Sequence, residues 1–150
     1  MKVTTFPLTE RFENITGAED GVTIEVRQAR EGEHIQRQQL FAKTTRIFDT
    51  PELGEVGMGD SVRLEMEQNN AKIRRAEAYL TLARVAGVVD ESDQELFKTA
   101  DTVDGPCVKG AMTEEAFNLA WNRLPTRVTR AISQKVWEVN PQWSPDYEGE

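Results

Sequence analysis

The sequence is poor in the residues that build catalytic and metal sites. Its 150 residues include one cysteine, Cys107, and one histidine, His34. A single cysteine excludes an internal disulfide and a Cys-x-x-Cys zinc or redox site within one chain, and it fits a reducing compartment. His34 lies among polar residues of a predicted helix, where a surface position is the expected role. An enzyme or metal protein built from His34, Cys107 and scattered carboxylates stays open as a third interpretation.

Motifs for binding phosphate and calcium are also missing. The glycines of the stretch Gly54–Gly59 lack the lysine of a phosphate-binding loop, and no G-x-G-x-x-G occurs. The acidic run Asp90–Asp93 lacks the glycine and the final glutamate of an EF-hand loop. Carboxylates are plentiful, but pairing them as acid and base depends on the fold. We therefore expect a protein that is not an enzyme, with no catalytic residue, no cofactor and no metal.

The chain has little positive charge and no long apolar run. Lys and Arg number 18 against 26 Asp and Glu, which gives a formal net charge of −8. General binding to nucleic-acid phosphates needs clustered Lys and Arg, so we expect no nucleic-acid partner. No stretch approaches the roughly 20 apolar residues of a membrane span, and no apolar signal-peptide segment follows Lys2. A soluble, cytoplasmic protein without a membrane partner is the expectation.

The length of 150 residues suggests a single domain. Such a chain buries about 70% of its unfolded surface, so its stability requires no disulfide or metal. We expect a flexible N-terminal arm over residues 1–20, one helical domain over 21–143 and an acidic tail over 144–150. The expected fold class is mainly α with a small N-terminal β element (α+β), a compact helical domain that ends in a helix–Pro–helix pair.

Hydrophobic periodicity predicts the elements of the first half. Alternating apolar residues at Val22–Val26 predict a half-buried strand, and spacings of three, four and seven over 31–48 predict a helix. Residues 49–61, with one proline and three glycines, predict a loop. A second strand is expected at Val62–Met66, although these residues also suit the start of a helix. A long helix then runs from about Asn69 to Ala86 and is closed by Gly87.

The middle of the chain is charged. The long helix carries basic residues, which usually mean a solvated face; the alternative is docking onto an acidic partner or an acidic region of the same chain. The segment Val88–Pro106 is such a region, with six acidic residues and one lysine. Within it, Ser92 is expected to cap a short helix whose buried side includes Phe97. Residues 101–111 are expected to form a turn-rich connection.

The stretch Met112–Trp143 predicts two helices broken at Pro125. Thr113 is a good N-cap, and the two glutamates after it suit the positive end of the helix dipole. Apolar residues at i, i+3, i+4 and i+7 from Phe117 form one stripe. Pro125 suits the start of a new helix, and a second apolar stripe ends at Asn140-Pro141, because the residue before a proline avoids the helical conformation.

All three tryptophans lie in this stretch. For Trp121 and Trp137, a core position and a contact with another polypeptide are both open, since tryptophan and arginine are enriched at interfaces. Trp143 follows Pro141, so we expect it to be partly exposed, where it either covers the helix end or docks on a partner. The predicted protein-binding residues are Phe117, Trp121, Leu124, Trp137 and Trp143, with Arg123, Arg127 and Arg130 as a polar rim.

Three segments resemble the tail assembly chaperones of long-tailed, siphovirus-type bacteriophages. They are GVTIEVRQAREGEHIQRQQLFAKTTR (Gly21–Arg46), NNAKIRRAEAYLTLARVAGVVDESD (Asn69–Asp93) and TEEAFNLAWNRLPTRVTRAISQKVWEVNPQW (Thr113–Trp143). The likeness is one of pattern and order from Gly21 to Trp143. The chain departs from the family in an extra acidic link, Glu95–Gly110, before the last helix pair.

The resemblance implies a small, mainly helical, non-enzymatic protein of the host bacterial cytoplasm. Such chaperones bind the tape-measure protein and keep it soluble until tail-tube subunits assemble around it; in many of these phages a ribosomal frameshift makes a longer form that also engages the tube protein. The tape-measure protein is thus the expected partner, with the tail-tube protein and a second copy of the chain as further candidates. The alternative is a structural virion component, such as a head–tail connector or tail-tube-associated subunit.

Overall fold

A computed structural model describes residues 8–17, 21–48, 59–103 and 105–147 of the chain. The chain divides into two compact units. The first, which we call the sheet unit, comprises Met1–Ala29 and Ala78–Glu150; the second, the helical unit, comprises Arg30–Glu77. We describe each unit by itself.

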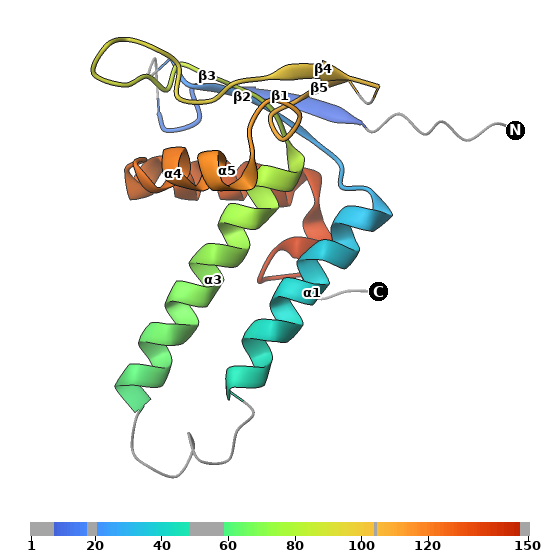
Figure 1. Cartoon of the computed structure of the whole chain (residues 1–150), viewed down its shortest axis with the longest axis vertical. Coiled ribbons are helices and arrows are strands. Elements are labelled where there is room, and N and C mark those ends of the chain that lie inside the picture. Colours follow the sequence, from blue (N-terminus) through green and yellow to red (C-terminus); the bar gives the residue numbers. More distant parts are fainter. Residues whose placement is uncertain (1–7, 18–20, 49–58, 104, 148–150) are drawn as a thin grey trace, which may run out of the picture. The chain divides into compact units, whose positions relative to one another are not determined.

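The sheet unit is organised around a three-stranded antiparallel sheet of order β1-β2-β3 (Figure 1). The strands are β1 (Thr9–Glu13), β2 (Thr23–Arg27) and β3 (Leu82–Ala86). In β2, Ile24 and Val26 are buried while Thr23 and Glu25 are half-buried, so one face of the strand enters the core. This alternation confirms the strand predicted at Val22–Val26.

A close backbone approach joins the ends of β2 and β3. Gly87 has a φ of +90°, and a Cβ built on it would lie 2.1 Å from the carbonyl oxygen of Gly21. No residue with a side chain fits that space, and a positive φ favours glycine. Gly87 therefore ends a strand, rather than the helix that we expected it to close.

The end of the acidic segment forms a short hairpin. It consists of β4 (Ala100–Thr102) and β5 (Gly105–Cys107), which pair antiparallel. The Val108 amide donates a hydrogen bond to the Leu82 carbonyl at 3.1 Å, which ties the end of the hairpin to β3. Arg84 of β3 pairs with Glu25 at 3.2 Å and with Asp101 at 3.8 Å. For Arg84, the acidic groups that it pairs with therefore belong to the same chain, which was one of the alternatives for the basic residues.

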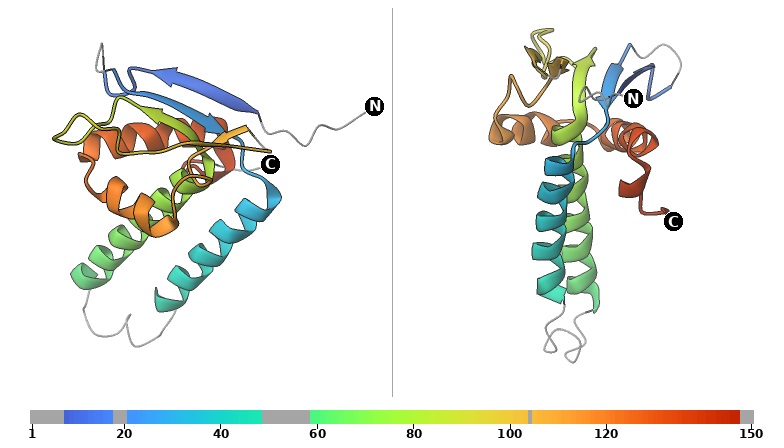
Figure 2. Two further views of the ribbon diagram at one scale, coloured as in Figure 1. Left: turned by 45° about the horizontal axis from the view of Figure 1, so that its top comes forward. Right: turned by 90° about the vertical axis from the view of Figure 1, so that its right-hand side faces the viewer.

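Two helices cover one face of the sheet, as Figures 1 and 2 show. They are α4 (Glu114–Asn122) and α5 (Thr126–Val139), followed by a 3₁₀ turn, η1 (Pro141–Trp143). Thr113 caps α4, because its hydroxyl accepts a hydrogen bond from the Ala116 amide at 3.1 Å. The predicted helix–Pro–helix pair is confirmed, with its break at Pro125 and its end at Asn140.

The core of the sheet unit lies between the sheet and this helix pair. Phe117 is at its centre, fully buried, with its ring 5.1 Å from Tyr79, 5.4 Å from Phe97 and 5.8 Å from Trp121. Offset and tilted aromatic contacts at these distances add to the energy of burial. The same core includes the following buried aliphatic residues: Ile24, Val26, Leu82, Val85, Ile132 and Val136.

Asn140 fastens the end of α5 to β2. Its side chain is 2% exposed, and its Oδ1 accepts from the Ala29 amide at 2.8 Å. Its Nδ2 donates to the carbonyls of Arg27 at 3.2 Å and Val136 at 3.3 Å. A buried amide that makes all these bonds satisfies backbone groups at two element ends.

The helical unit contains α1 (Glu31–Phe48) and most of α3 (Gly59–Thr81), whose last turn belongs to the sheet unit. The two helices run in opposite directions (Figures 1 and 2). Arg37 of α1 pairs with the buried Glu77 of α3 at 2.5 Å. Glu33 accepts a hydrogen bond from the Arg30 amide at 2.8 Å, which satisfies a donor at the start of α1. The helix predicted over 31–48 is confirmed.

The expected fold class is wrong. The described residues form two small antiparallel sheets of three and two strands beside the helices, rather than a mainly helical domain with one N-terminal β element. Two segments account for most of the three-stranded sheet that was not expected. Leu82–Ala86 is a strand because its backbone pairs with β2, although its residues also fit the end of a helix. Residues Thr9–Glu13, expected in an irregular arm, pair with β2 as β1.

Further elements differ from the prediction in the middle of the chain. Val62–Met66 lies within α3, so the second predicted strand is wrong. The helix expected after Ser92 is a turn, because Oδ1 of Asp90 accepts hydrogen bonds from the backbone amides of Ser92 and Gln94 at 2.8 and 3.1 Å. Residues 101–111, expected to be turns, contribute to the hairpin. Of the predicted loop over 49–61, residues 49–58 lie outside the described part and 59–61 begin α3.

Candidate polypeptide-binding face on α5

Three of the predicted contact residues lie inside the sheet unit. Phe117, Trp121 and Trp143 are 0%, 6% and 3% exposed. The expectation that Trp143 is partly exposed is wrong, because the η1 turn, closed by a 3.0 Å bond from its amide to the Asn140 carbonyl, returns its indole to the core. Their burial makes these three residues part of the scaffold that holds α4 and α5 in place.

Two further predicted residues have partners in the chain. Leu124 is half-buried and packs against the core. Arg123 is exposed, and its Nη2 lies 3.1 and 3.3 Å from the two carboxylate oxygens of Glu91. This exposed pair joins the end of α4 to the acidic segment and contributes little stability.

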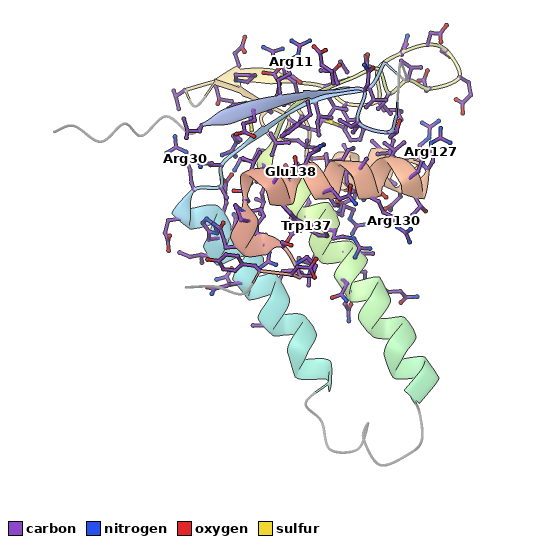
Figure 3. All side chains as sticks on the ribbon, turned by 180° about the vertical axis from the view of Figure 1, so that it is seen from behind. Arg11, Arg30, Arg127, Arg130, Trp137 and Glu138 are labelled. Carbon is purple, nitrogen blue, oxygen red and sulfur yellow. The ribbon has the colours of Figure 1, made fainter. Side chains whose placement is uncertain are left out.

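The remaining predicted residues, Arg127, Arg130 and Trp137, share the outer face of α5. Because an α-helix turns by about 100° per residue, positions 127, 130, 134, 137 and 138 fall within about 100° of one another around its axis. Figure 3 shows Arg127 at the first turn, Arg130 and Trp137 on one side of the helix, and Glu138 nearer its end. We call this stripe, together with Pro141 of η1, the outer face of α5; its members are Arg127, Arg130, Gln134, Trp137, Glu138 and Pro141.

The first half of the outer face is basic. Arg127 and Arg130 are exposed, and neither forms an ion pair within the described part of the chain. No acidic residue lies in the first turn of α5, and its N-cap, Pro125, supplies no side-chain hydrogen bond. The positive end of the helix dipole thus coincides with two cationic side chains. An acidic side chain of a partner would be stabilised there by the helix dipole and by the two arginines.

The second half of the outer face borders an open groove of about 340 Å³. Its wall is formed by Gln134, Trp137, Glu138, Pro141, Ser144, Asp146 and Tyr147. Trp137 is half-buried and packs partly on the core, while Tyr147 is 51% exposed. The groove is therefore mainly apolar, with aromatic side chains on α5 and on the segment that follows it.

Two carboxylates give the groove an acidic rim. Glu138 pairs with Lys135, whose Nζ lies 3.3 Å from Oε2 and 3.4 Å from Oε1. The same Nζ lies 5.0 Å from the centre of the Phe12 ring, which holds this lysine toward β1. Asp146 forms no ion pair with any described residue. The outer face thus changes from basic to apolar to acidic along α5.

Two titratable side chains elsewhere in the sheet unit, Tyr79 and Asp90, form hydrogen bonds within the fold. Burial raises the pKa of Tyr79 above its usual 10.0, with smaller contributions from Glu114 and Cys107, and its hydroxyl donates to the Met112 carbonyl at 2.9 Å. Backbone amides of Gln94 and then Ser92 lower the pKa of Asp90 below 3.8. Cys107 is buried as a free thiol. Across the described residues, no group of three His, Cys, Asp or Glu side chains is placed to hold a metal ion.

The sequence analysis missed part of this face. Gln134, Glu138 and Pro141 continue the spacing of Arg127 and Arg130 by three or four residues, so the helical periodicity that located the buried stripe could have located them as well. Asp146 and Tyr147 also line the groove, but no periodicity in the sequence indicates this. Their positions depend on the turn after Pro141, in which the Tyr147 amide bonds to the Ser144 carbonyl at 3.1 Å.

Comparisons with protein-family models, with curated proteins and with solved structures gave no match. Among the described helices, none is both long enough and apolar enough to cross a membrane.

Proposed function

We propose that this protein is a non-enzymatic polypeptide-binding protein that acts as a phage tail assembly chaperone. Its client is the tape-measure protein, which it keeps soluble in the host cytoplasm during tail assembly. The observation that carries the proposal is the outer face of α5, where a basic end, an apolar groove and an acidic rim follow one another along one helix. The role in tail assembly rests on the resemblance of the three sequence segments.

The layout of this face suits an amphipathic helix. From Arg127 to Glu138 the rise along α5 is about 16 Å, or three turns of a client helix. A helix laid along it places apolar anchors over the groove and charged residues over the two ends, as in other helix-in-groove complexes. A tape-measure protein, expected to be long and helical, offers many such segments.

The groove and the net charge both favour a polypeptide client. A volume of about 340 Å³ is at the lower end of the range for small-molecule sites, and the groove is open rather than enclosed. It suits one or two side chains of a partner. The net charge of −8 favours dispersion of a complex whose client is prone to aggregate.

Co-expression with a tape-measure fragment tests the proposal. We expect the wild-type chain to keep the fragment in the soluble fraction, and Trp137→Ala or the double variant Arg127→Ala/Arg130→Ala to leave more of it in the pellet. Leu119→Ala is the matched control, since Leu119 is 65% exposed, belongs to α4 and does not line the groove. Equal fragment solubility with and without the chain would overturn the proposed function.

A further inference from the structure

We propose that the groove beside Trp137 receives an arginine side chain of the partner polypeptide. The inference rests on the proposed function, because it takes the partner to be a polypeptide segment lying along the outer face of α5. It adds the chemistry of the anchor residue, which the proposed function leaves open.

Charge complementarity selects a cation. The groove is lined by two carboxylates, Glu138 and Asp146, and by no Lys, Arg or His side chain. Lys135, on the neighbouring turn of α5, pairs with Glu138 and lies over the Phe12 ring. Asp146 has no such partner among the described residues. The groove therefore holds more negative than positive charge.

The aromatic wall selects arginine over lysine. Trp137 and Tyr147 line the groove together with Pro141, so an incoming side chain meets apolar surface before it reaches the carboxylates. The guanidinium group is planar and weakly hydrated, stacks on aromatic rings and forms paired hydrogen bonds with carboxylates. The ammonium group of lysine also interacts with aromatic rings, but it is more strongly hydrated and lacks the planar group that stacks on a ring and pairs with a carboxylate through two parallel hydrogen bonds.

The opposite end of the face sets a second requirement on the partner. Arg127 and Arg130 precede Glu138 by eleven and eight residues, a rise of about 12–16 Å along α5. A partner helix that places its arginine in the groove therefore places an aspartate or glutamate eight or eleven residues away, on the same side of that helix, over the basic end. This spacing gives the partner a defined direction along α5 and can be sought in any client sequence.

The test uses the full chain and a pair of synthetic helical peptides. Both carry an acidic residue eleven positions from the anchor, on the same side of the peptide helix; one has arginine at the anchor and the other has citrulline, its neutral isostere. Binding is followed by the NMR signal of the Trp137 indole N–H, with the buried Trp121 and Trp143 as internal references. We expect the arginine peptide to shift the Trp137 signal and to bind about fivefold to tenfold more tightly than the citrulline peptide at low salt.

Charge variants locate the effect. Glu138→Gln/Asp146→Asn should remove the preference for arginine, and higher salt should reduce it. Glu10→Gln/Glu115→Gln makes the same change of two charges at exposed positions outside the groove and should keep the preference. Equal affinities of the two peptides for the wild-type chain would overturn the inference, as would a preference that survives in Glu138→Gln/Asp146→Asn.

The two proposals fail in different ways. If the tape-measure fragment binds through Trp137 while the peptides bind equally, the arginine site is wrong and the proposed function stands. If the arginine peptide is preferred while the fragment neither binds nor stays soluble, the groove takes a cationic partner of another kind and the proposed function is wrong.

Discussion

Replacing Asn140 by alanine tests how the helix pair is held to the sheet. The substitution removes an amide that is 2% exposed and that bonds to Ala29, Arg27 and Val136. Val136 keeps a bond to the backbone amide of residue 140 at 2.8 Å, so its carbonyl stays satisfied. The Ala29 amide loses the partner that holds it at 2.8 Å. The cost therefore falls mainly at the end of β2.

The magnitude follows from these contacts. Leaving one partly buried N–H without a partner costs about 1–3 kcal/mol, and losing the Nδ2 bonds costs about 1 kcal/mol more. We expect Asn140→Ala to lower the free energy of unfolding by about 2–4 kcal/mol. With a urea dependence near 2 kcal/mol per molar, the unfolding midpoint falls by about 1–2 M.

Urea unfolding followed by tryptophan fluorescence measures this change. Asn118→Ala is the matched control, since Asn118 is half-buried on α4 and its side chain makes no hydrogen bond within the described part of the chain. We expect the control to unfold near the wild-type midpoint, because alanine also has the higher helix propensity. A midpoint for Asn140→Ala within about 0.3 M of the control would refute the role assigned to this amide.

Three further perturbations test other parts of the fold. Gly87→Ala should destabilise the fold by about 2–5 kcal/mol, because of the positive φ and the clash with Gly21. Gly32→Ala should instead stabilise α1 by up to about 1 kcal/mol, because a Cβ added there would meet nothing within 4 Å. Thermal unfolding distinguishes the two variants. Tyr79→Phe should cost about 1 kcal/mol and remove the loss of stability that the raised tyrosine pKa produces as the pH rises above 10.0. The lowered pKa of Asp90 stabilises the fold above pH 3.8, so the stability difference between wild type and Asp90→Asn should close as the pH falls below that value; a difference that widens there contradicts the assignment.

The location of the protein after assembly separates the two roles that the sequence left open. A tail assembly chaperone leaves before the particle is complete, whereas a head–tail connector or tube-associated subunit stays. Mass spectrometry of purified particles should therefore find the chain absent or scarce. A fixed number of copies per particle would favour the structural role.

The elements that the sequence predicted are those with strong local signals. The cap at Thr113, the break at Pro125 and the end at Asn140 depend on backbone chemistry within a few residues, and the structure confirms all three. The strand at Val22–Val26 was predicted because its alternation is regular. Such features need no knowledge of the rest of the fold.

The elements that the sequence did not predict depend on distant partners. Leu82–Ala86 carries apolar residues that suit a helix or a strand, and only its pairing with β2, more than fifty residues earlier, decides between them. The polar strand β1 has no apolar alternation of its own and forms because β2 supplies its hydrogen bonds. Without these pairings a mainly helical domain was the simpler prediction.

The candidate site was half predictable for the same reason. Arg127, Arg130 and Trp137 were named from composition and helical spacing, and they lie on one outer face. Phe117 and Trp121 were named from the same signals and lie in the core. An aromatic residue on an apolar stripe fits core and interface equally well, and only the position of the sheet separates them.

Calorimetric titration of the purified chain with a tape-measure fragment tests the central claim most directly. We predict that wild type and Leu119→Ala bind with equal affinity, and that Trp137→Ala/Tyr147→Ala, folded by circular dichroism, binds at least about tenfold more weakly. Equal affinity of all three proteins, or no binding by wild type, would contradict the account.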